Sequence, residues 1–330
     1  MGLPVYRERD ETVTLHLTEQ DVIQLLTMPD TLRVVEGAFR AWDEGHAINH
    51  PRRRIRVPQG FLHVMEAALV DDNTMGLKTY ATVADGTTFV VQLFDSETGE
   101  LTALIDADRL GQMRTGAASG IAANYLALEN ARTVGIIGTG YQAQTQLEAV
   151  CAVRPIQRVR AFSRTPERRE AFARTMSDRL GVSVDAVDSA EATVRDANVV
   201  ITVTPAREPV FEGEWLKPGA CVLAAGSNNV LRREIDSATL ERAGRIVVDD
   251  LDQAQTECGE LIAAAERGQV RWEGIHELRQ VVAGRVSGRD SADEITVFES
   301  QGVALEDVAV ARHLIDLAQP QGVGTAIRPG

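Results

Sequence analysis

Hydrophobic positions recur with two different periods along the chain, and the change of period separates two predicted sheets. Residues 15–45 show the helical period in two segments around Met28-Pro29-Asp30, which predicts two helices with a break at the proline. From about residue 52 to 106, apolar and polar residues alternate, which predicts an antiparallel sheet. Its clearest part is a hairpin, in which residues 89–94 and 101–105 flank a turn that ends at Gly99.

The chain from residue 110 onward predicts an α/β fold. A helix with one apolar face is predicted over 110–126, and short apolar strands follow at 133–137, 159–162, 182–187, 198–203, 221–225 and 245–249. Helical segments separate most of these strands, which is typical of a doubly wound parallel sheet, the Rossmann fold. A last strand at 295–298 precedes a helix at 303–318 that is expected to return to the first sheet. We therefore predict a Rossmann domain at 119–301 and an α+β domain formed from both chain ends, 1–118 together with 302–330.

The composition is that of a globular protein and disfavours several classes of function. The 330 residues are 44% hydrophobic and 25% charged, and no apolar run approaches the 18 residues of a membrane helix. The N-terminal segment carries charges where a signal peptide would be apolar, and the three cysteines have no paired spacing. A net charge of −14 disfavours nucleic acid as a partner. We expect a cytoplasmic protein without a metal site and without a membrane or nucleic-acid partner.

A glycine-rich turn between a predicted strand and the next helix is the most informative motif. Gly138 permits a tight turn, Gly140 allows backbone N–H groups to approach a phosphate, and Ala143 lets the helix pack close to the strand. The helix N-terminus then offers unpaired N–H groups and its positive dipole end to a pyrophosphate. We predict a redox dinucleotide site here, with Tyr141 and Gln142 beside it, and a plain tight turn is the alternative.

The end of the second Rossmann strand favours NADP(H), with NAD(H) still possible. About 20 residues beyond the glycines, an NAD site usually offers an acidic residue to the ribose hydroxyl. Here the strand ends in Ser163-Arg164-Thr165, and a guanidinium with small hydroxyl groups suits a ribose 2′-phosphate. The alternative is that Arg164 is a solvated surface residue.

Three segments together resemble the ornithine cyclodeaminase/mu-crystallin family. They are Leu110-Gly-Gln-Met-Arg114-Thr115-Gly-Ala-Ala-Ser119, Gly138-Thr-Gly140-Tyr-Gln142-Ala143 and Glu294-Ile-Thr-Val-Phe-Glu-Ser300-Gln-Gly302-Val-Ala-Leu-Glu306-Asp307. The resemblance spans roughly residues 15 to 320. It implies a homodimer in which the domain built from both chain ends carries the substrate site and the dimer sheet. It also implies a tightly held NAD(P) and small substrates that bear an α-carboxylate.

The activities of that family share one chemistry. They include ornithine cyclodeamination, alanine and arginine dehydrogenation, and reduction of ketimines, pyrroline carboxylates and iminosuccinate. Each of them exchanges a hydride between a nicotinamide and the carbon of an amine or imine, so the fold alone does not select the substrate.

The resemblance also implies three residues that hold the substrate carboxylate. They are an arginine after the second helix, a strand lysine and an arginine of the following helix, which match Arg54, Lys78 and Arg114. Charge-assisted donors of this kind are what a carboxylate needs when it leaves water. Lys78 can in addition hold a proton near the imine nitrogen.

Four arginines crowd the first of these positions, and the choice among them stays open. Strand alternation places Arg54 and Arg56 on one face and Arg53 on the other, and the alternatives to Arg54 are Arg52, Arg53 and Arg56. We call the three cationic residues that hold the substrate carboxylate the clamp. In the family pattern, His63 and Met65 lie on the strand that faces the clamp. A strand histidine satisfied by its neighbours is an equal interpretation of His63.

Further cofactor contacts are expected on the arginine–threonine helix and at the ends of later strands. The residues are Arg114, Thr115, Thr202, Val203, Thr204, Gly226, Ser227 and Ser300. For the threonines, the alternative is an ordinary β-strand composition.

Asn228 departs from the family pattern. In cyclodeaminases an aspartate at this place orients the substrate amine and handles its proton, whereas an amide has no titratable proton. Glu306-Asp307 is interpreted as helix N-terminal charge, too remote to replace that aspartate. Reduction of a preformed imine needs a hydride, one proton donor and a carboxylate anchor, so it tolerates Asn228, with Lys78 or a bound water as the donor.

We therefore predict an NAD(P)H-dependent oxidoreductase. It would interconvert an α-imino acid, either a ketimine or a cyclic imino acid, and the corresponding amino acid. One alternative is a cyclodeaminase-type ammonia lyase that uses NAD without net redox change. The other is a non-catalytic NADP-binding protein such as mu-crystallin.

Overall fold

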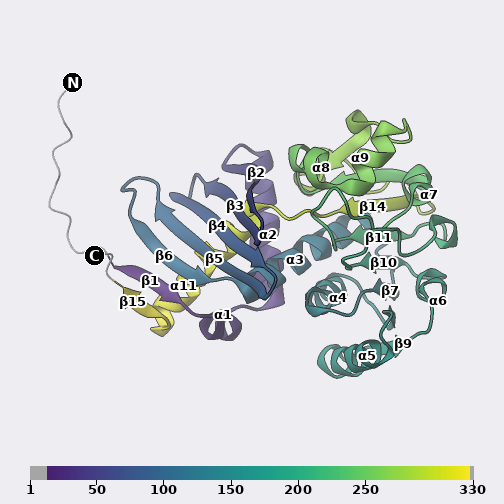
Figure 1. The fold of residues 1–330 in the computed structure, drawn as a ribbon, viewed down its shortest axis with the longest axis horizontal. Helices are drawn as coiled ribbons and strands as arrows, with labels where there is room; N and C mark the ends of the chain where they lie inside the picture. Colours follow the sequence, from purple (N-terminus) through teal and green to yellow (C-terminus); the bar gives the residue numbers. More distant parts are fainter. Residues whose placement is uncertain (1–12, 328–330) are drawn as a thin grey trace.

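The computed structural model describes residues 13–327 and contains two sheets joined by one long helix (Figure 1). The first sheet has seven strands in the order β15-β1-β6-β5-β4-β3-β2. Their bounds are β1 Thr14–Leu17, β2 Ala47–Val57, β3 Gly60–Leu69, β4 Thr74–Val83, β5 Gly86–Asp95, β6 Leu101–Asp106 and β15 Thr325–Ile327. Strands β2 to β6 form the antiparallel meander that the alternating pattern predicts.

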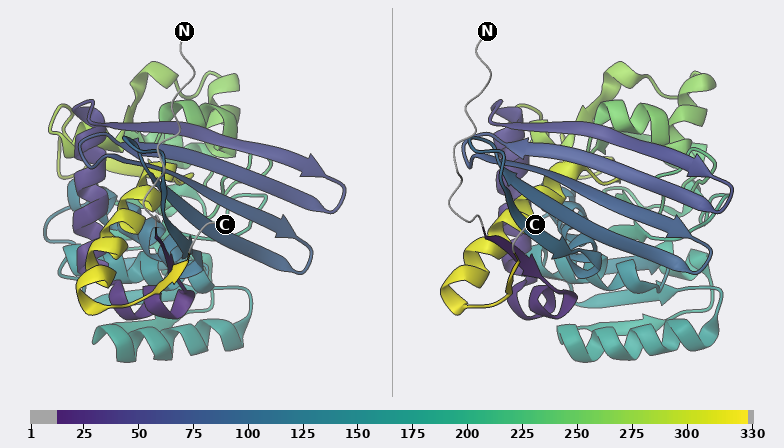
Figure 2. Two further views of the ribbon diagram at one scale, coloured as in Figure 1. Left: turned by 90° about the vertical axis from the view of Figure 1, so that its left-hand side faces the viewer. Right: turned by 60° about the vertical axis from the view of Figure 1, so that its left-hand side comes forward.

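Segments from both ends of the described chain complete this first sheet. Strand β1 pairs parallel to β6, and β15 pairs antiparallel to β1. Three helices belong to the same region, α1 (Glu19–Leu25), α2 (Met28–Asp43) and α11 (Ala304–Gln321). Figure 2 shows α2 and α11 against the sheet, where α11 packs on β2 to β5. The helix predicted at 303–318 therefore does return to the first sheet.

The break between the first two helices lies at residues 26–27, and the predicted position at Met28-Pro29-Asp30 is wrong, because these residues form the first turn of α2. Thr27 caps α2 through the backbone N–H of Asp30, and the proline lies in the first turn. A proline is tolerated there because the first N–H groups of a helix have no partner within the helix. The sequence also failed to predict β1, which is too short to show a period.

The second sheet contains eight parallel strands in the order β13-β12-β14-β11-β10-β7-β8-β9, which confirms the doubly wound Rossmann fold. Their bounds are β7 Thr133–Ile137, β8 Arg158–Phe162, β9 Ser183–Ala186, β10 Val199–Thr202, β11 Cys221–Ala224, β12 Ala243–Val248, β13 Ile275–Glu277 and β14 Ile295–Glu299. The strand order reverses between β7 and β10. A crevice outside the carboxyl ends of the strands opens at such a reversal.

Helices connect the strands of this second sheet. They are α4 Tyr141–Val153, α5 Pro166–Leu180, α6 Ala190–Val194, α7 Ser237–Arg242, α8 Leu251–Glu257, α9 Gly259–Glu266 and α10 Leu278–Val282, with single turns η1 Gly213–Trp215 and η2 Trp272–Gly274. Among residues 13–327, none of the helices has the length and apolar character needed to cross a membrane.

Helix α3 (Asp108–Leu126) joins the two sheets and is buried along most of its length. It packs against α2, α4 and α11, so it belongs to the cores on both sides. The proposed domain boundary at residue 118 falls inside this helix, which continues across it without a break. We keep the division into 119–301 and the two chain ends as a proposal.

Candidate functional site

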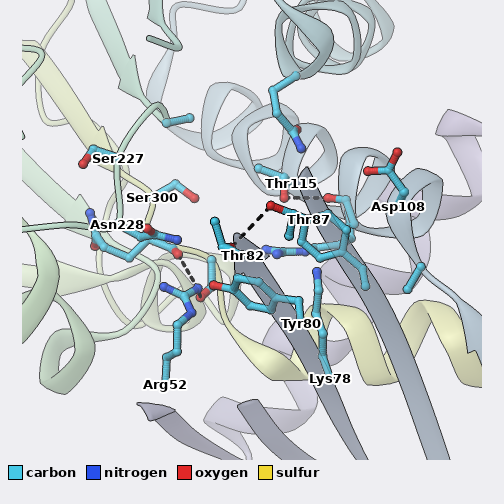
Figure 3. A pocket seen from close by; sticks show the side chains of 18 of the residues that line it. Arg52, Lys78, Tyr80, Thr82, Thr87, Asp108, Thr115, Ser227, Asn228 and Ser300 are labelled. Carbon is cyan, nitrogen blue, oxygen red and sulfur yellow. Dashed lines mark hydrogen bonds between the residues drawn. The ribbon is translucent and has the colours of Figure 1, made fainter. Parts of the chain in front are cut away.

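The proposed substrate residues surround one cavity of about 240 Å³ between the two sheets. Strands β4 and β5 and helix α3 supply one side, and the segments that follow β11 and β14 supply the other. Figure 3 shows Arg52, Lys78 and Tyr80 on the first side and Ser227, Asn228 and Ser300 on the second. The cavity therefore lies at the carboxyl edge of the Rossmann sheet, where such folds bind ligands.

Lys78 enters this cavity from the middle of the antiparallel sheet. In the strand register it lies between Met65 of β3 and Val91 of β5, both buried, so its stem is enclosed. Its Nζ lies 2.8 Å from Oδ1 of Asp307, and the side chain is 3% exposed. Burial lowers the pKa of Lys78 to about 8, although Asp307 acts in the opposite direction. The amine therefore titrates near neutral pH.

Arg114 is held at the same place by the start of α11. Its Nη1 lies 2.7 Å from Oε2 of Glu306, and its Nε donates to Oδ1 of Asp307 over 3.1 Å. Gly302, with φ +74°, leaves room for the guanidinium, because a Cβ there would lie 2.5 Å from Nη1. Lys78 and Arg114 thus share Asp307, which had been interpreted from the sequence as helix N-terminal charge.

The structure brings Arg52 rather than Arg54 into the lining of the cavity. The guanidinium of Arg52 is buried, with Nη1 2.6 Å from Oε2 of Glu257 and Nη2 donating to the backbone oxygens of Gln301 and Gly302. Arg54 ion-pairs with Glu257 from the side of the solvent, and its side chain is 28% exposed.

The remaining arginines of β2 point elsewhere. Arg53 is exposed and ion-pairs with Glu66, and Arg56 lies over the ring of Phe61. The sequence could not separate Arg52 from its neighbours because a bulge shifts the register between His50 and Arg53.

His63 and Met65 are buried behind the clamp and do not line the cavity. His63 stacks on Tyr80 with ring centroids 4.0 Å apart, and its Nδ1 accepts from Nε of Arg54. Burial lowers the pKa of His63 to about 4, so the ring is neutral. The Sδ of Met65 lies 3.3 Å from Nε of Arg52. Met65 therefore contacts Arg52, which lines the cavity, and His63 contacts the neighbouring Arg54.

The glycine-rich turn has the geometry that a dinucleotide pyrophosphate requires. Gly138 has φ +107°, and a Cβ there would lie 2.4 Å from the backbone oxygen of Val203. Gly140 faces open space and begins α4 without a side-chain cap, so the first N–H groups of the helix are available. Ala143 is fully buried against the neighbouring elements, and Tyr141 is half exposed.

A second cavity, of about 610 Å³, adjoins this turn. It is lined by Gly138, Gly140, Ser163, Arg164, Thr165, Arg168, Val203, Thr204 and Arg207, among others. Arg168 and Arg207 had not been singled out from the sequence. In the described part of the chain these two and Arg164 form no ion pair, so three free guanidinium groups border the cavity.

The other proposed cofactor residues fall into three groups. Thr115, Gln142, Gly226, Ser227, Asn228 and Ser300 line the first cavity, together with Lys78 and Arg114. Val203 and Thr204 line the second cavity. Thr202 lines neither, because it is fully buried and its hydroxyl donates to Glu234. Both cavities border the start of α4, the first at Gln142 and the second at Gly138 and Gly140.

A profile of the ornithine cyclodeaminase/mu-crystallin family matches residues 12–321. The chain belongs to this family. Alanine dehydrogenase of Archaeoglobus fulgidus is 36% identical over 323 residues, which are 96% of this chain and 98% of that protein. Delta(1)-pyrroline-2-carboxylate reductase of Bacillus cereus is 39% identical over 239 residues, 72% of this chain and 73% of that protein.

Solved structures of the ornithine cyclodeaminase/mu-crystallin family have the same fold. The Delta(1)-pyrroline-2-carboxylate reductase of Thermococcus litoralis, in complex with NADH and L-proline, superimposes with a TM-score of 0.92 at 34% identity. That comparison covers 95% of this chain and 100% of the other. An archaeal alanine dehydrogenase dimer with bound NAD gives 0.91 at 36% identity, covering 96% and 99%. The resemblance seen in the three sequence motifs is thereby confirmed.

Proposed function

We propose that the protein is an NAD(P)H-dependent oxidoreductase that interconverts an α-imino acid and the corresponding amino acid by hydride transfer. The observation that carries this proposal is the convergence of Arg52, Lys78 and Arg114 on one cavity at the carboxyl edge of a Rossmann sheet. The relatives support it, because they are named alanine dehydrogenase, pyrroline-2-carboxylate reductase and iminosuccinate reductase.

The substrate carboxylate is bound by the three cationic side chains. Each of them is already oriented by a buried carboxyl group, Glu257 for Arg52 and the Glu306–Asp307 pair for the others. Burial raises the pKa of Glu306 to about 8, so this group is mostly protonated at neutral pH. The clamp then keeps a net positive charge for the substrate anion.

Lys78 handles the proton at the substrate nitrogen. Reduction of an imine adds a hydride to carbon and a proton to nitrogen, and Nζ of Lys78 is the titratable donor with a pKa of about 8 in this cavity. Asp307 orients Nζ through the 2.8 Å contact. In the direction of amino-acid oxidation the neutral amine accepts the same proton.

The residues around the glycine turn fit a dinucleotide. When bound, the nicotinamide supplies or accepts the hydride. Gly140 and the uncapped start of α4 receive the pyrophosphate, and the segment from Gly226 to Asn228 borders the reacting end. For the coenzyme we favour NADP(H), because Arg164, Arg168 and Arg207 line the second cavity and form no ion pair with any of residues 13–327. Solved relatives with NADH or NAD show that NAD(H) also suits this fold.

Asn228 favours redox turnover over deamination. It lines the cavity, and its side chain offers hydrogen bonds but no titratable proton. Ring closure with loss of ammonia requires repeated proton transfers at nitrogen, in which an amide at this position cannot take part.

A turnover assay tests the proposal. The protein should oxidise NADPH stoichiometrically, followed at 340 nm, with pyrroline-2-carboxylate, piperideine-2-carboxylate, or pyruvate plus an amine. Ammonia release from ornithine without net cofactor change would contradict it in favour of the lyase. The same panel with NADH measures the coenzyme preference.

A further inference from the structure

Glu234 lies in the segment between β11 and α7 and is 1% exposed. Its carboxylate accepts four hydrogen bonds. Oε1 accepts from the backbone N–H and the hydroxyl of Thr204, over 2.6 and 2.7 Å, and Oε2 accepts from the hydroxyl of Thr202 and the backbone N–H of Gly226, over 3.1 and 2.7 Å. Four donors on two oxygens occupy every acceptor position that lies in the plane of a carboxylate.

These donors come from two separate strand ends. Thr202 is the last residue of β10 and Thr204 follows it, whereas Gly226 follows β11. The approach is so close that a Cβ on Gly226 would lie 2.3 Å from N of Thr204 and 2.5 Å from Oε1 of Glu234. A single side chain therefore holds the two segments together at the carboxyl edge of the Rossmann sheet.

The two segments border the two cavities described above. Val203 and Thr204 line the cavity beside the glycine turn, and Gly226, Ser227 and Asn228 line the cavity of Lys78 and Arg114. We infer that Glu234 is a positioning residue, which fixes the β10 and β11 ends as the wall against which the coenzyme binds. This inference rests on the proposed function, because it concerns the coenzyme of that reaction.

The surroundings of Glu234 show why a carboxylate at this place has a specific role. Its nearest ionisable neighbours are acidic: its own backbone N–H donates to Glu260 of α9, and Glu299 of β14 lies close to both. Burial raises the pKa of Glu234 to about 7, whereas the bonds from Thr204 and Gly226 favour the ionised form. A buried acid beside two others costs free energy, and the four donors offset this cost.

The test measures NADPH binding by the full chain at pH 8, where the carboxylate is ionised, through NADPH fluorescence without substrate. In Glu234→Gln, either orientation of the amide turns its NH₂ toward a backbone N–H, of Thr204 or of Gly226. The dissociation constant should rise about 10-fold or more. At saturating NADPH the KM for the imine substrate should change less than about two-fold. Glu214→Gln, an exposed and otherwise comparable change, should bind like the wild type.

A second pair of variants keeps the inference testable if Glu234→Gln does not fold. Thr202→Val removes one donor to the carboxylate, and Thr202→Ser retains it. Thr202→Val should bind NADPH more weakly, and Thr202→Ser should restore the affinity to within about two-fold of the wild type. Wild-type affinity in Glu234→Gln, or equal affinities of the two Thr202 variants, would overturn the inference. A wild-type protein that binds neither NADPH nor NADH would instead contradict the proposed function.

Discussion

At the scale of single residues, Lys78 combines deep burial with a carboxylate partner, and this gives its reactivity a defined pH dependence. Burial lowers the pKa to about 8, so the ammonium form is present below that pH and is lost above it. Because imine reduction consumes the proton, kcat for reduction should fall as the pH rises through about 8, and oxidation of the amino acid should rise. Steady-state rates at 340 nm between pH 6 and 10 measure both.

Removal of the amine should abolish most of the activity. Lys78→Met should lower kcat by about 10²- to 10⁴-fold, the usual contribution of a positioned acid or base. Lys78→Arg keeps the charge but does not titrate, so its rate should show no break near pH 8. NADPH binding, measured by fluorescence, should persist in both variants. A Lys78→Met enzyme that keeps the wild-type rate and pH profile would rule out the proton-transfer role.

The arginines of β2 give a further prediction, for which Arg53 on the same strand is the control. Arg52→Met removes a buried guanidinium that lines the cavity, and the KM for the imine substrate should rise about 100-fold, or roughly 3 kcal/mol. Arg53→Met, on the exposed face of the same strand, should change it less than about two-fold. A larger effect at Arg54 than at Arg52 would return the carboxylate contact to Arg54.

Single residues also show where prediction from the sequence ends. Lys78 and Arg114 were assigned to the site by the resemblance, and the structure places both on the cavity. Asp307 could not be assigned, because its role depends on α11 returning across roughly 200 residues of chain to meet β4, and no local pattern encodes that contact. Glu234 was missed for the same reason. Its signal in the sequence is only an acidic residue between Arg233 and Ile235.

At the scale of elements, periodicity predicted the long strands and most of the helices. The β4–β5 pair and the parallel strands of the Rossmann sheet have clear apolar patterns, and their pairing follows from short connections. Strands β1, β13 and β15 were missed, because each has only three or four residues and lacks the continuous apolar run that predicted the equally short β10 and β11. The bulge in β2 had no signal either, and it decides which arginine faces the cavity.

The β8–α5 connection carries the prediction on coenzyme choice. Arg164 borders the second cavity from this connection and Arg168 borders it from the first turn of α5. A guanidinium bonded to a phosphate is worth about 1.5–3 kcal/mol. The double variant Arg164→Gln/Arg168→Gln should raise the KM for NADPH about 10-fold or more and leave the KM for NADH within about two-fold. Arg174→Gln, an exposed arginine on the same helix, is the matched control. Equal weakening of both coenzymes would contradict a 2′-phosphate contact.

At the scale of the whole molecule, the antiparallel sheet has one covered face and one open face. Helix α11 packs on β2 to β5 from the side of Lys78. On the other side, six large apolar residues are between 41% and 61% exposed: Ile48, Ile55, Val57, Leu62, Met75 and Val83. Strand register puts them together, since Ile55 pairs with Leu62 and Leu62 precedes the inward-facing His63. Contiguous apolar surface of this kind is typical of an interface.

We predict that this open face joins two copies of the chain, as the family resemblance implies, and an archaeal alanine dehydrogenase of the same fold is described as a dimer. A two-fold interface uses the same patch on both copies, so each substitution acts twice. Ile55→Asp/Leu62→Asp places four carboxylates in the contact, and light scattering should then give a mass near 35.8 kDa in place of twice that value. Ile23→Glu, at an exposed apolar residue of α1, should leave the dimer mass unchanged. A wild-type protein that elutes as a monomer at micromolar concentration would contradict the prediction.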